Sequence, residues 1–412
     1  MTMGQDMSSE QRPLSGIRVL DLSHVLAMPY CTMILGDLGA EVIKVERPVT
    51  GDDARHFGPY KEGESAYFMS VNRNKRSVTL DLRNAEAKAV LRDLIACSDV
   101  LAENYKPGTL AKLGFSEQEV KAINPRIVYA SICGFGHDSV YPGRPGYDII
   151  AQAFSGFMSI TGYPENPPTR AGASVGDIIS GLFTAVGILA SLRGVDREGQ
   201  GQRLDIAMTD CMLAVLENAV VRQTVAGQTP GRVGSRHPAI TPFDVFETAN
   251  GHVVIAVGND RLWEMFCQAV PQLAEALGDE RFSSNPQRTE NHADLKPIIE
   301  AWSRTLTSAA LVEQLSVVGV PCGPVNTIAD VVADPNTIHR DMLAAFDHPT
   351  AGHVVTANNP IHFDRTPCKA HRPAPELGQH TEDVMTAVLG YPSERVDELR
   401  SSGAFGQADS TS

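Results

Sequence analysis

The chain has 412 residues, 42% of them hydrophobic and 20% charged, a length and composition typical of a globular protein with two or three domains. Its formal net charge of -14 at pH 7 argues against nucleic acid or an anionic membrane as the main partner. The seven cysteines are scattered, odd in number and without a CxxC pair, which predicts a reducing compartment and no zinc site. The N-terminus lacks the apolar core of a signal peptide and no run approaches the length of a membrane span, so we expect a cytoplasmic protein.

The first half of the chain alternates between strand and helix patterns. Residues 1–13 are polar and are expected to form a disordered tail. Apolar runs over 17–22 and 40–46 predict strands, and the segment between them has Pro29 near its start and Gly39 after its end, as helices do. Further strands are predicted over 77–82, 100–104 and 126–135, separated by helical patterns, one of which opens at Asn84. This alternation predicts an α/β fold with a doubly wound parallel sheet.

The second half changes character. From 147 to about 193 the sequence is largely helical, and the Gly- and Pro-rich stretch 226–242 marks a domain boundary. The pair Asn250-Gly251 beyond it predicts the turn of a hairpin, so we expect a second, smaller α+β unit. Short strands are predicted again from about Met342.

Two common nucleotide-binding motifs are missing from the sequence, since no GxGxxG follows the first strand and no GxxxxGK[ST] loop occurs. A GxSxG match occurs at residues 172–176, but it does not follow a predicted strand, as the elbow of a hydrolase requires. Ligands of doubly wound sheets bind at the carboxyl ends of the strands. The candidate binding loops therefore begin at His24, Arg47, Asn104 and Gly134, although a lone histidine such as His24 is more often structural than catalytic.

Positive charges gather before the strand at 77–82. Arg73, Lys75 and Arg76 suit either a solvated sheet edge or an anion site for phosphates. Taken alone, the pattern favours the solvated edge, because charge runs are usually solvated.

Asp177 follows Gly176 and directly precedes an apolar helical run. By position alone it is a helix N-cap, whose carboxylate the helix dipole keeps ionised. The small neighbours Gly172, Gly176 and Gly181 also leave room for a bulky electrophile, as a covalent carboxylate nucleophile needs. Position alone does not decide between cap and nucleophile.

Collinear blocks of sequence run through nearly the whole chain: LSGIRVLDLSHVLAMPYCTMILGDLGAEVIKVERP, NRNKRSVTLDL, AENYKPGTLAKLGF, SICGFG, PGYDIIAQAFSGFMSITG and GVPCGPVN. Together they resemble the class III CoA-transferases, whose relatives include formyl-CoA transferase and α-methylacyl-CoA racemase. The resemblance implies a large Rossmann-like CoA-binding domain of residues 14–225 and 342–412 and a small α+β domain of residues 226–341. It also implies a homodimer of two interlocked, ring-like chains.

The same resemblance assigns site residues. Asp177 matches the family nucleophile, an Asp in a Gly-Asp pair that opens a helix. The positions that match CoA contacts are His24, Leu26, Ala27, Arg47, Lys75, Asn104, Tyr105, Lys112, Leu113 and Phe135. Arg47 and Lys75 would contact adenine or phosphate, whereas Cys133 replaces a lysine of formyl-CoA transferase and is left out of the predicted contacts.

The implied reaction moves coenzyme A between carboxylic acids through an aspartyl anhydride and an aspartyl-CoA thioester, with no cofactor beyond CoA and no metal. The segment GRVGSRHPAITPF lacks the glycine run of formyl-CoA transferase. It is more similar to relatives that use succinyl-CoA and a C4–C6 dicarboxylate such as glutarate, itaconate or mesaconate, with Arg236 and His237 at the distal carboxylate.

Three alternatives stay open. A formyl-CoA or acetyl-CoA:oxalate transferase would share the chemistry with other acids. A 2-methylacyl-CoA racemase resembles the chain less, because Tyr147 stands where racemases carry a basic histidine. A CoA-binding protein without turnover would bind CoA with no adduct at Asp177.

Overall fold

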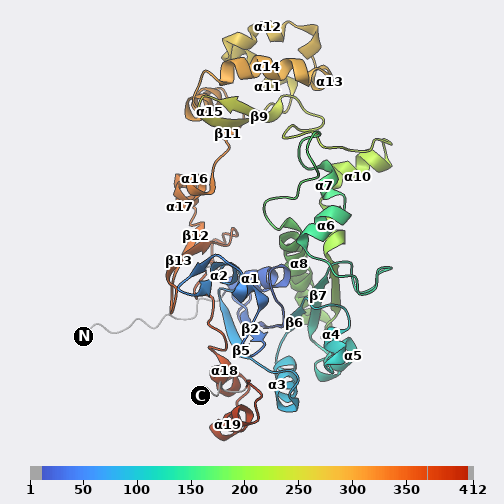
Figure 1. Ribbon diagram of the computed structural model, residues 1–412, viewed down its shortest axis with the longest axis vertical. Helices are drawn as coiled ribbons and strands as arrows, with labels where there is room; N and C mark the ends of the chain where they lie inside the picture. Colours follow the sequence, from blue (N-terminus) through green and yellow to red (C-terminus); the bar gives the residue numbers. More distant parts are fainter. Residues whose placement is uncertain (1–11, 369, 407–412) are drawn as a thin grey trace, which may run out of the picture. The chain divides into compact units, whose positions relative to one another are not determined.

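The computed structural model describes residues 12–368 and 370–406 (Figure 1). The predicted tail of residues 1–13 lies almost wholly outside them. The chain divides into two compact units, and the larger consists of Met1–Phe157, Ala171–Asn218 and Asn336–Ser412. The smaller consists of Met158–Arg170 and Ala219–Pro335, so residues 158–170 belong to the unit opposite to the one that our boundaries gave them.

The larger unit is built on a six-stranded sheet in the order β5-β2-β1-β6-β7-β8. Its strands are β1 Arg18–Asp21, β2 Glu41–Glu46, β5 Lys75–Thr79, β6 Val100–Glu103, β7 Val128–Cys133 and β8 Arg203–Ala207. All neighbouring pairs are parallel, which confirms the predicted α/β sheet. The strand order reverses between β1 and β6, so the loops after these two strands diverge at the carboxyl edge, where such sheets bind ligands.

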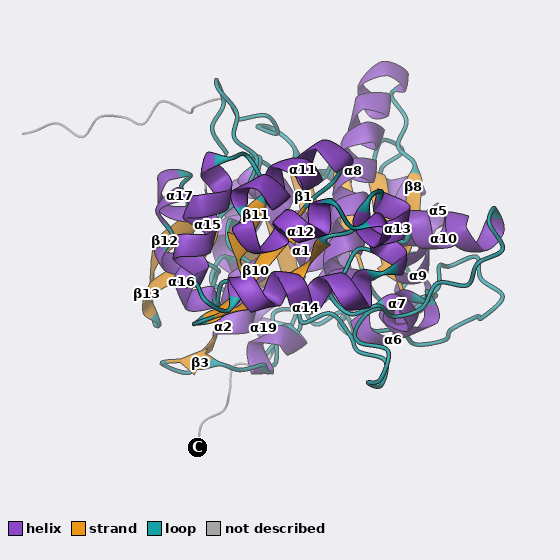
Figure 2. Ribbon diagram, turned by 90° about the horizontal axis from the view of Figure 1, so that it is seen from above, coloured by secondary structure: helices purple, strands orange, loops and turns teal. Residues whose placement is uncertain are grey.

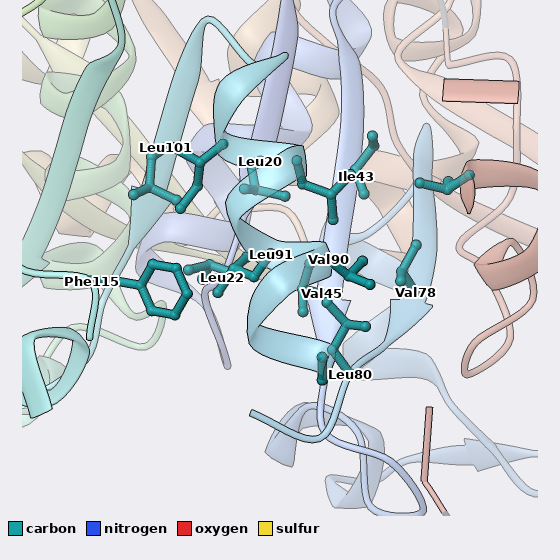
Figure 3. Close-up of a cluster of buried hydrophobic side chains, with 14 of the residues drawn as sticks. Leu20, Leu22, Ile43, Val45, Val78, Leu80, Val90, Leu91, Leu101 and Phe115 are labelled. Atoms are coloured by element: carbon teal, nitrogen blue, oxygen red, sulfur yellow. The ribbon is translucent and has the colours of Figure 1, made fainter. Parts of the chain in front are cut away.

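Alternate residues of the strands contribute to two hydrophobic cores, one on each face of the sheet. Leu20, Ile43 and Leu101 contribute to one core with Val90 and Leu91 of helix α3 (Ala85–Ala96), as Figure 3 shows. The preceding residues on the same strands contribute to the other core, which includes side chains of α1 (Ala27–Asp37) and α8 (Val175–Glu198). This alternation follows from the two-residue period of a strand and covers both faces of the sheet with helices.

The other elements of the larger unit are short. Its remaining helices, including those that reach the division between the units, are α2 Ala66–Val71, α4 Thr109–Lys112, α5 Glu117–Ile123, α6 Asp148–Phe154, α7 Phe157–Ile160, α9 Met208–Ala214, α10 Glu217–Thr224, α17 Pro335–His339, α18 Thr381–Asp383 and α19 Ser393–Ser401, with one-turn elements η1 Asp53–His56 and η4 Val384–Val388. Two antiparallel pairs, β3 Tyr60–Lys61 with β4 Glu64–Ser65 and β12 Leu343–His348 with β13 Gly352–Ala357, complete it. The second pair confirms the strands predicted after Met342.

Helix α8 is long and apolar enough to span a membrane by length and composition. Our statement that no run approaches a membrane span is therefore wrong for this helix. Ala185, Ile188 and Val195 are buried in the core that α8 shares with the sheet, and core helices of soluble proteins pass the same test.

The smaller unit combines a three-stranded antiparallel sheet with several helices (Figure 2). The strands are β9 Phe243–Thr248, β10 Gly251–Ala256 and β11 Cys322–Pro324. The predicted hairpin is confirmed, but its turn residues are Ala249 and Asn250, one residue earlier than predicted, because Gly251 already pairs with Thr248. The helices are α11 Asp260–Ala269, α12 Ala274–Leu277, α13 Asn285–Glu290, α14 His292–Ser303, α15 Ser308–Val317 and α16 Ile328–Ala333, with 3-10 turns η2 Pro271–Leu273 and η3 Glu280–Phe282. Its core is aromatic and aliphatic, with Trp263, Phe266 and Trp302 at its centre.

Candidate active site

Asp177 lies in the first turn of α8, but it does not cap the helix. The N-cap residue is Ser174, so Asp177 is the third residue of the helix and the predicted cap role is wrong. Asp148, the first residue of α6, does the capping from outside, because its Oδ1 accepts a hydrogen bond from the Gly176 N–H at 2.8 Å. Its Oδ2 accepts a second from Gln152 Nε2 at 2.8 Å. The cap contact that the sequence suggested for Asp177 is therefore supplied by another element.

The Asp177 carboxylate is largely buried without a donor. Within the described part of the chain, no side chain or backbone group hydrogen-bonds to it. Burial raises the pKa of Asp177 to about 7, and the nearby charge of Asp148 adds to the shift. The helix dipole therefore does not keep this group fully ionised at neutral pH, because a dipole effect of about 1 kcal/mol is smaller than the cost of removing the charge from water.

Two of the three glycines near Asp177 serve helix packing. A side-chain carbon on Gly181 would lie 2.6 Å from the Ala27 carbonyl oxygen, and one on Gly176 would lie 3.1 Å from Asp148 Oδ1. These glycines allow α8 to approach α1 and α6 closely. Only Gly172, where an added carbon meets no atom within 4 Å, leaves the open space that we expected of all three.

A cavity of about 440 Å³ lies at the carboxyl edge of the sheet. Its wall includes all four predicted binding loops, represented by His24, Arg47, Asn104 and Gly134. Tyr147 also lines it and directly precedes Asp148 in the chain, so the capping residue of α8 adjoins the cavity wall.

The loop after β1 is held rigidly at this cavity. Asn104 pairs with both backbone groups of His24, accepting from its N–H at 2.9 Å and donating to its carbonyl at 2.8 Å. The His24 ring stacks on Tyr105 with centroids 5.6 Å apart, and burial lowers the pKa of His24. Val25 adopts a φ of 64°, which is strained for a β-branched residue, and Asp52 Oδ1 holds it by accepting from its N–H at 2.9 Å.

A second cavity of about 930 Å³ shares Arg47 and Tyr105 with the first and is also lined by Leu113. These three residues, with His24 and Asn104 of the first cavity, form one group of the predicted CoA contacts. The arrangement provides adjoining spaces for an extended ligand.

The other predicted CoA contacts lie outside both cavity walls. Lys112 is an exposed residue at the end of α4. Leu26 and Ala27 are buried at the start of α1, where Leu26 is the N-cap residue and has no side-chain cap. Phe135 is buried edge-on to Phe154, with ring centroids 5.0 Å apart.

Lys75 is a structural lysine in this fold. It is 1% exposed, and its ammonium donates to Asp21 Oδ2 at 3.0 Å and to the Pro29 carbonyl at 3.0 Å. A third bond goes to Asn72 Oδ1 at 2.9 Å. All three donors are therefore used inside the protein, and the structure does not support the predicted contact of Lys75 with CoA.

The neighbouring arginines are also paired. Arg73 is buried and binds Asp37 through two nitrogens, at 3.0 and 2.7 Å, while it donates to the Ala357 carbonyl at 2.7 Å. Arg76 forms an ion pair with Glu41. The segment is thus neither the solvated edge nor the anion site that we considered.

The predicted acceptor contacts lie in the smaller unit. Arg236 lines a cavity of about 390 Å³ together with Ser235 and Lys296. Among the described residues, no carboxylate is within ion-pair distance of the Arg236 guanidinium. His237 is not in the wall of this cavity, and its Nδ1 accepts from the Ala239 N–H at 3.1 Å.

Sequence reasoning missed three residues near the candidate site. Asp148 directly follows Tyr147 and had no predicted role. For Tyr67, burial and the charges of Asp177 and Asp148 raise the pKa to about 12. Arg144 lines the first cavity with its guanidinium 5.0 Å from the centre of the Phe135 ring. A signal existed only for Asp148, an acidic residue at the predicted start of a helix.

Comparison with known proteins identifies the family of the chain. A model of CoA-transferase family III matches residues 14–381. The chain is 38% identical over 387 residues to the succinate–glutarate CoA-transferase of Agrobacterium fabrum, covering 92% of this chain and 96% of that protein. It is 39% identical over 371 residues to the acetyl-CoA:oxalate CoA-transferase of Acetobacter aceti, covering 89% and 93%. The crystal structure of a CAIB/BAIF family protein from Brucella suis matches with a TM-score of 0.83 and 38% identity, over 92% of this chain and 100% of that one. The chain therefore belongs to CoA-transferase family III, as its sequence blocks predicted.

Proposed function

We propose that the protein transfers coenzyme A from succinyl-CoA to a dicarboxylic acid, with Asp177 as the covalent nucleophile. The observation that carries this proposal is the state of Asp177: a largely buried carboxylate with no hydrogen-bond donor among the described residues and a pKa raised to about 7. A carboxylate with little solvation is a stronger nucleophile than a hydrated one, and at neutral pH a large fraction is ionised.

The reaction proceeds by four acyl exchanges. An Asp177 oxygen attacks the thioester carbon, and the C–S bond breaks to give a mixed anhydride and CoA thiolate. The thiolate attacks the Asp177 carbonyl carbon, which forms an aspartyl-CoA thioester and releases the donor as its carboxylate. The acceptor carboxylate then attacks this thioester and expels the thiolate, which finally attacks the acceptor carbonyl and frees Asp177. Charge and atoms balance at every step, so the sequence of exchanges itself consumes no cofactor.

We assign the stabilisation of the oxyanion intermediates to backbone amides at the start of α1. Ala27 lies against the α8 backbone at Gly181, one helical turn from Asp177. The N-cap Leu26 supplies no side-chain bond to the first amides of α1. Amides at a helix N-terminus bind negative charge, so these groups would serve the tetrahedral intermediates.

The acceptor is proposed to be a C4–C6 dicarboxylate. The relatives from Agrobacterium fabrum and human are named for succinate or succinyl-CoA and glutarate, and a relative from Haloarcula hispanica is named for mesaconate. Arg236 lines a cavity and has no acidic partner among the described residues, so its guanidinium is available for a distal carboxylate. The neighbouring His237 would contribute through Nε2, since its Nδ1 already accepts from the backbone.

Chemical trapping tests the nucleophile. Incubation with succinyl-CoA followed by hydroxylamine is expected to convert the Asp177 side chain into a hydroxamate, located by peptide mass spectrometry. Asp177→Asn is expected to show neither the adduct nor CoA transfer while still binding CoA. Transfer at the normal rate without any change at Asp177 would disprove the mechanism, and CoA binding without transfer in the native protein would favour a binding protein.

A panel of acids tests the acceptor. We expect C4–C6 dicarboxylates to accept CoA from succinyl-CoA more efficiently than oxalate, formate or acetate. Arg236→Ala is expected to raise KM for the dicarboxylate with little effect on the KM for succinyl-CoA, and an unchanged dicarboxylate KM would remove Arg236 from the acceptor site. Rapid exchange of the α-proton of a 2-methylacyl-CoA without CoA transfer would instead indicate a racemase.

A further inference from the structure

Three side chains with metal-binding atoms meet beside the CoA cavity. Cys133 ends β7, His137 lies four residues further on, and Asp205 is in β8, the parallel neighbour of β7. One ligand atom from each lies within 4.8 Å of the others. The thiol and the carboxylate come from two adjacent strands, and the imidazole comes from the loop that follows β7. No short sequence motif therefore contains all three.

The distances are close to those of an occupied tetrahedral site. Cys133 Sγ lies 3.7 Å from His137 Nδ1, and this nitrogen lies 3.0 Å from Asp205 Oδ1. Zinc at about 2.3 Å from sulfur and about 2.0 Å from nitrogen and oxygen places sulfur and nitrogen about 3.5 Å apart and nitrogen and oxygen about 3.3 Å apart. The third pair, Cys133 Sγ and an Asp205 oxygen, lies within 4.8 Å, whereas zinc would bring the two atoms to about 3.5 Å.

The loop does not need the imidazole to stay in place. The backbone N–H of His137 donates to Asp205 Oδ2 at 2.9 Å, and the N–H of Asp138 donates to the same oxygen at 3.4 Å. The carboxylate therefore fixes the loop through its backbone, and the His137 side chain adds a contact that is redundant for folding. On its other side, His137 Nε2 lies 3.9 Å from Glu103 Oε1, which is too far for a hydrogen bond, so Glu103 would orient the ring only after the two groups approach by about 1 Å.

We propose that Cys133, His137 and Asp205 form a binding site for zinc or another thiophilic divalent ion. Sulfur and imidazole ligands select such ions over magnesium and calcium. Three protein ligands leave a fourth position for water or an incoming ligand, and binding displaces the thiol proton to solvent. Because Cys133 also lines the 440 Å³ cavity, the ion would lie in the wall of the predicted CoA site. The proposal departs from our expectation of no metal site and is independent of the transfer mechanism.

Cobalt(II) provides a spectroscopic test on the full-length protein. Titration with Co²⁺ is expected to produce a thiolate-to-cobalt charge-transfer band with the intense visible bands of four-coordinate cobalt, and Zn²⁺ is expected to remove both. Cys133→Ser should lose the charge-transfer band, whereas Cys97→Ser, which alters an exposed cysteine, should keep it. Absence of the band in the native protein, or its persistence in Cys133→Ser, would overturn the proposal.

A second measurement tests the site without Cys133→Ser, in case that variant misfolds. Zn²⁺ is expected to slow alkylation of Cys133 by iodoacetamide, followed by peptide mass spectrometry, and to leave alkylation of Cys97 unchanged. The protection should vanish in His137→Ala. In Glu103→Gln, which removes only the charge beside His137, the affinity for Zn²⁺ should fall about tenfold, so that protection needs more Zn²⁺. An alkylation rate at Cys133 that does not respond to Zn²⁺ would equally refute the site.

Discussion

The ionisation of Asp177 couples the chemistry of the protein to its stability. A pKa of about 7 means that the folded protein binds a proton at this site under conditions in which the unfolded chain, with an ordinary aspartate, does not. The protonated group favours folding at low pH, and this contribution is lost as the pH rises through the folded pKa. The charged form that attacks the thioester is thus the form that the fold tolerates least.

Replacement of the nucleophile should therefore stabilise the protein at alkaline pH. Asp177→Asn removes the buried charge and is expected to raise the free energy of unfolding at pH 8 by on the order of 2–4 kcal/mol. At pH 5 the difference should fall to about 1.5 kcal/mol, because Asp177 is then protonated in the folded protein while the ordinary aspartate of the unfolded chain is still ionised. Thermal unfolding at both pH values checks this, and equal stability at pH 8 would mean that the carboxylate is well solvated.

The charge of Asp148 should set the pH profile of the reaction. Asp148→Asn keeps an oxygen that can accept from the Gly176 N–H but removes the negative charge that raises the pKa of Asp177. The acid limb of kcat/KM is expected to move to lower pH, since ionisation of Asp177 becomes easier. The matched variant Asp210→Asn, at an exposed position in α9, should leave the profile in place. A limb that does not move in Asp148→Asn would show that Asp148 is purely structural.

Individual charges were the least predictable features of the sequence. Lys75 and Arg47 carried the same prediction, yet Arg47 lines the cavities and Lys75 lies in the core beside Asp21. The difference depends on which carboxylate the fold brings to each cation: Asp21 lies 54 residues before Lys75 and is buried with it, whereas Arg47 pairs with Asp53, 6 residues further on. Asp177 was singled out by its position after a glycine at a helix start together with the family resemblance, but its pKa shift depends on burial and on Asp148, which local sequence does not report.

At the scale of elements, the contact of α8 with α1 positions the candidate nucleophile. The Ala27 carbonyl lies so close to Gly181 that a methyl group has no room. Any separation of these helices would move the first turn of α8, and Asp177 with it, relative to the start of α1.

Two alanine substitutions in one helix test this contact. Gly181→Ala is expected to destabilise the protein by about 2 kcal/mol and to lower kcat, because the clash outweighs the better helix propensity of alanine. Gly194→Ala, at a position where the added carbon meets no atom within 4 Å, should stabilise it by about 0.5–1 kcal/mol. If both variants behave alike, the close approach of the two helices does not limit the fold.

The regular elements were predictable where their periodicity was strong. The strands of the parallel sheet, the Asn84 cap and the hairpin of β9 and β10 follow from local patterns, and the structure confirms them with the hairpin turn one residue earlier than predicted. The cap of α8 did not follow from such a pattern, since Asp148 reaches it from a helix 28 residues earlier. Capping by a distant side chain leaves no mark on the sequence next to the helix.

At the scale of the whole molecule, we propose a homodimer. Leu182, Phe183 and Val186 project from α8 with large exposed fractions, 64% for Val186, and apolar groups of this size are usually covered in an assembly. The native mass from light scattering should be twice that of one chain. Val186→Glu is expected to shift the mass towards one chain, whereas Val317→Glu, at an exposed position of α15, should not. A native protein with the mass of one chain would refute the dimer.

The hydrophobic core around α3 has a consequence for biosynthesis. Leu20 and Ile43 share it with Val384, Leu399 and Ala404, so the two ends of the chain build one interior. During translation, β1 and β2 leave the ribosome long before the C-terminal residues of this core have been synthesised. During that interval their apolar side chains are open to chaperones or to aggregation. A stop codon that removed only the last few dozen residues would thus leave the oldest part of the nascent protein unfinished.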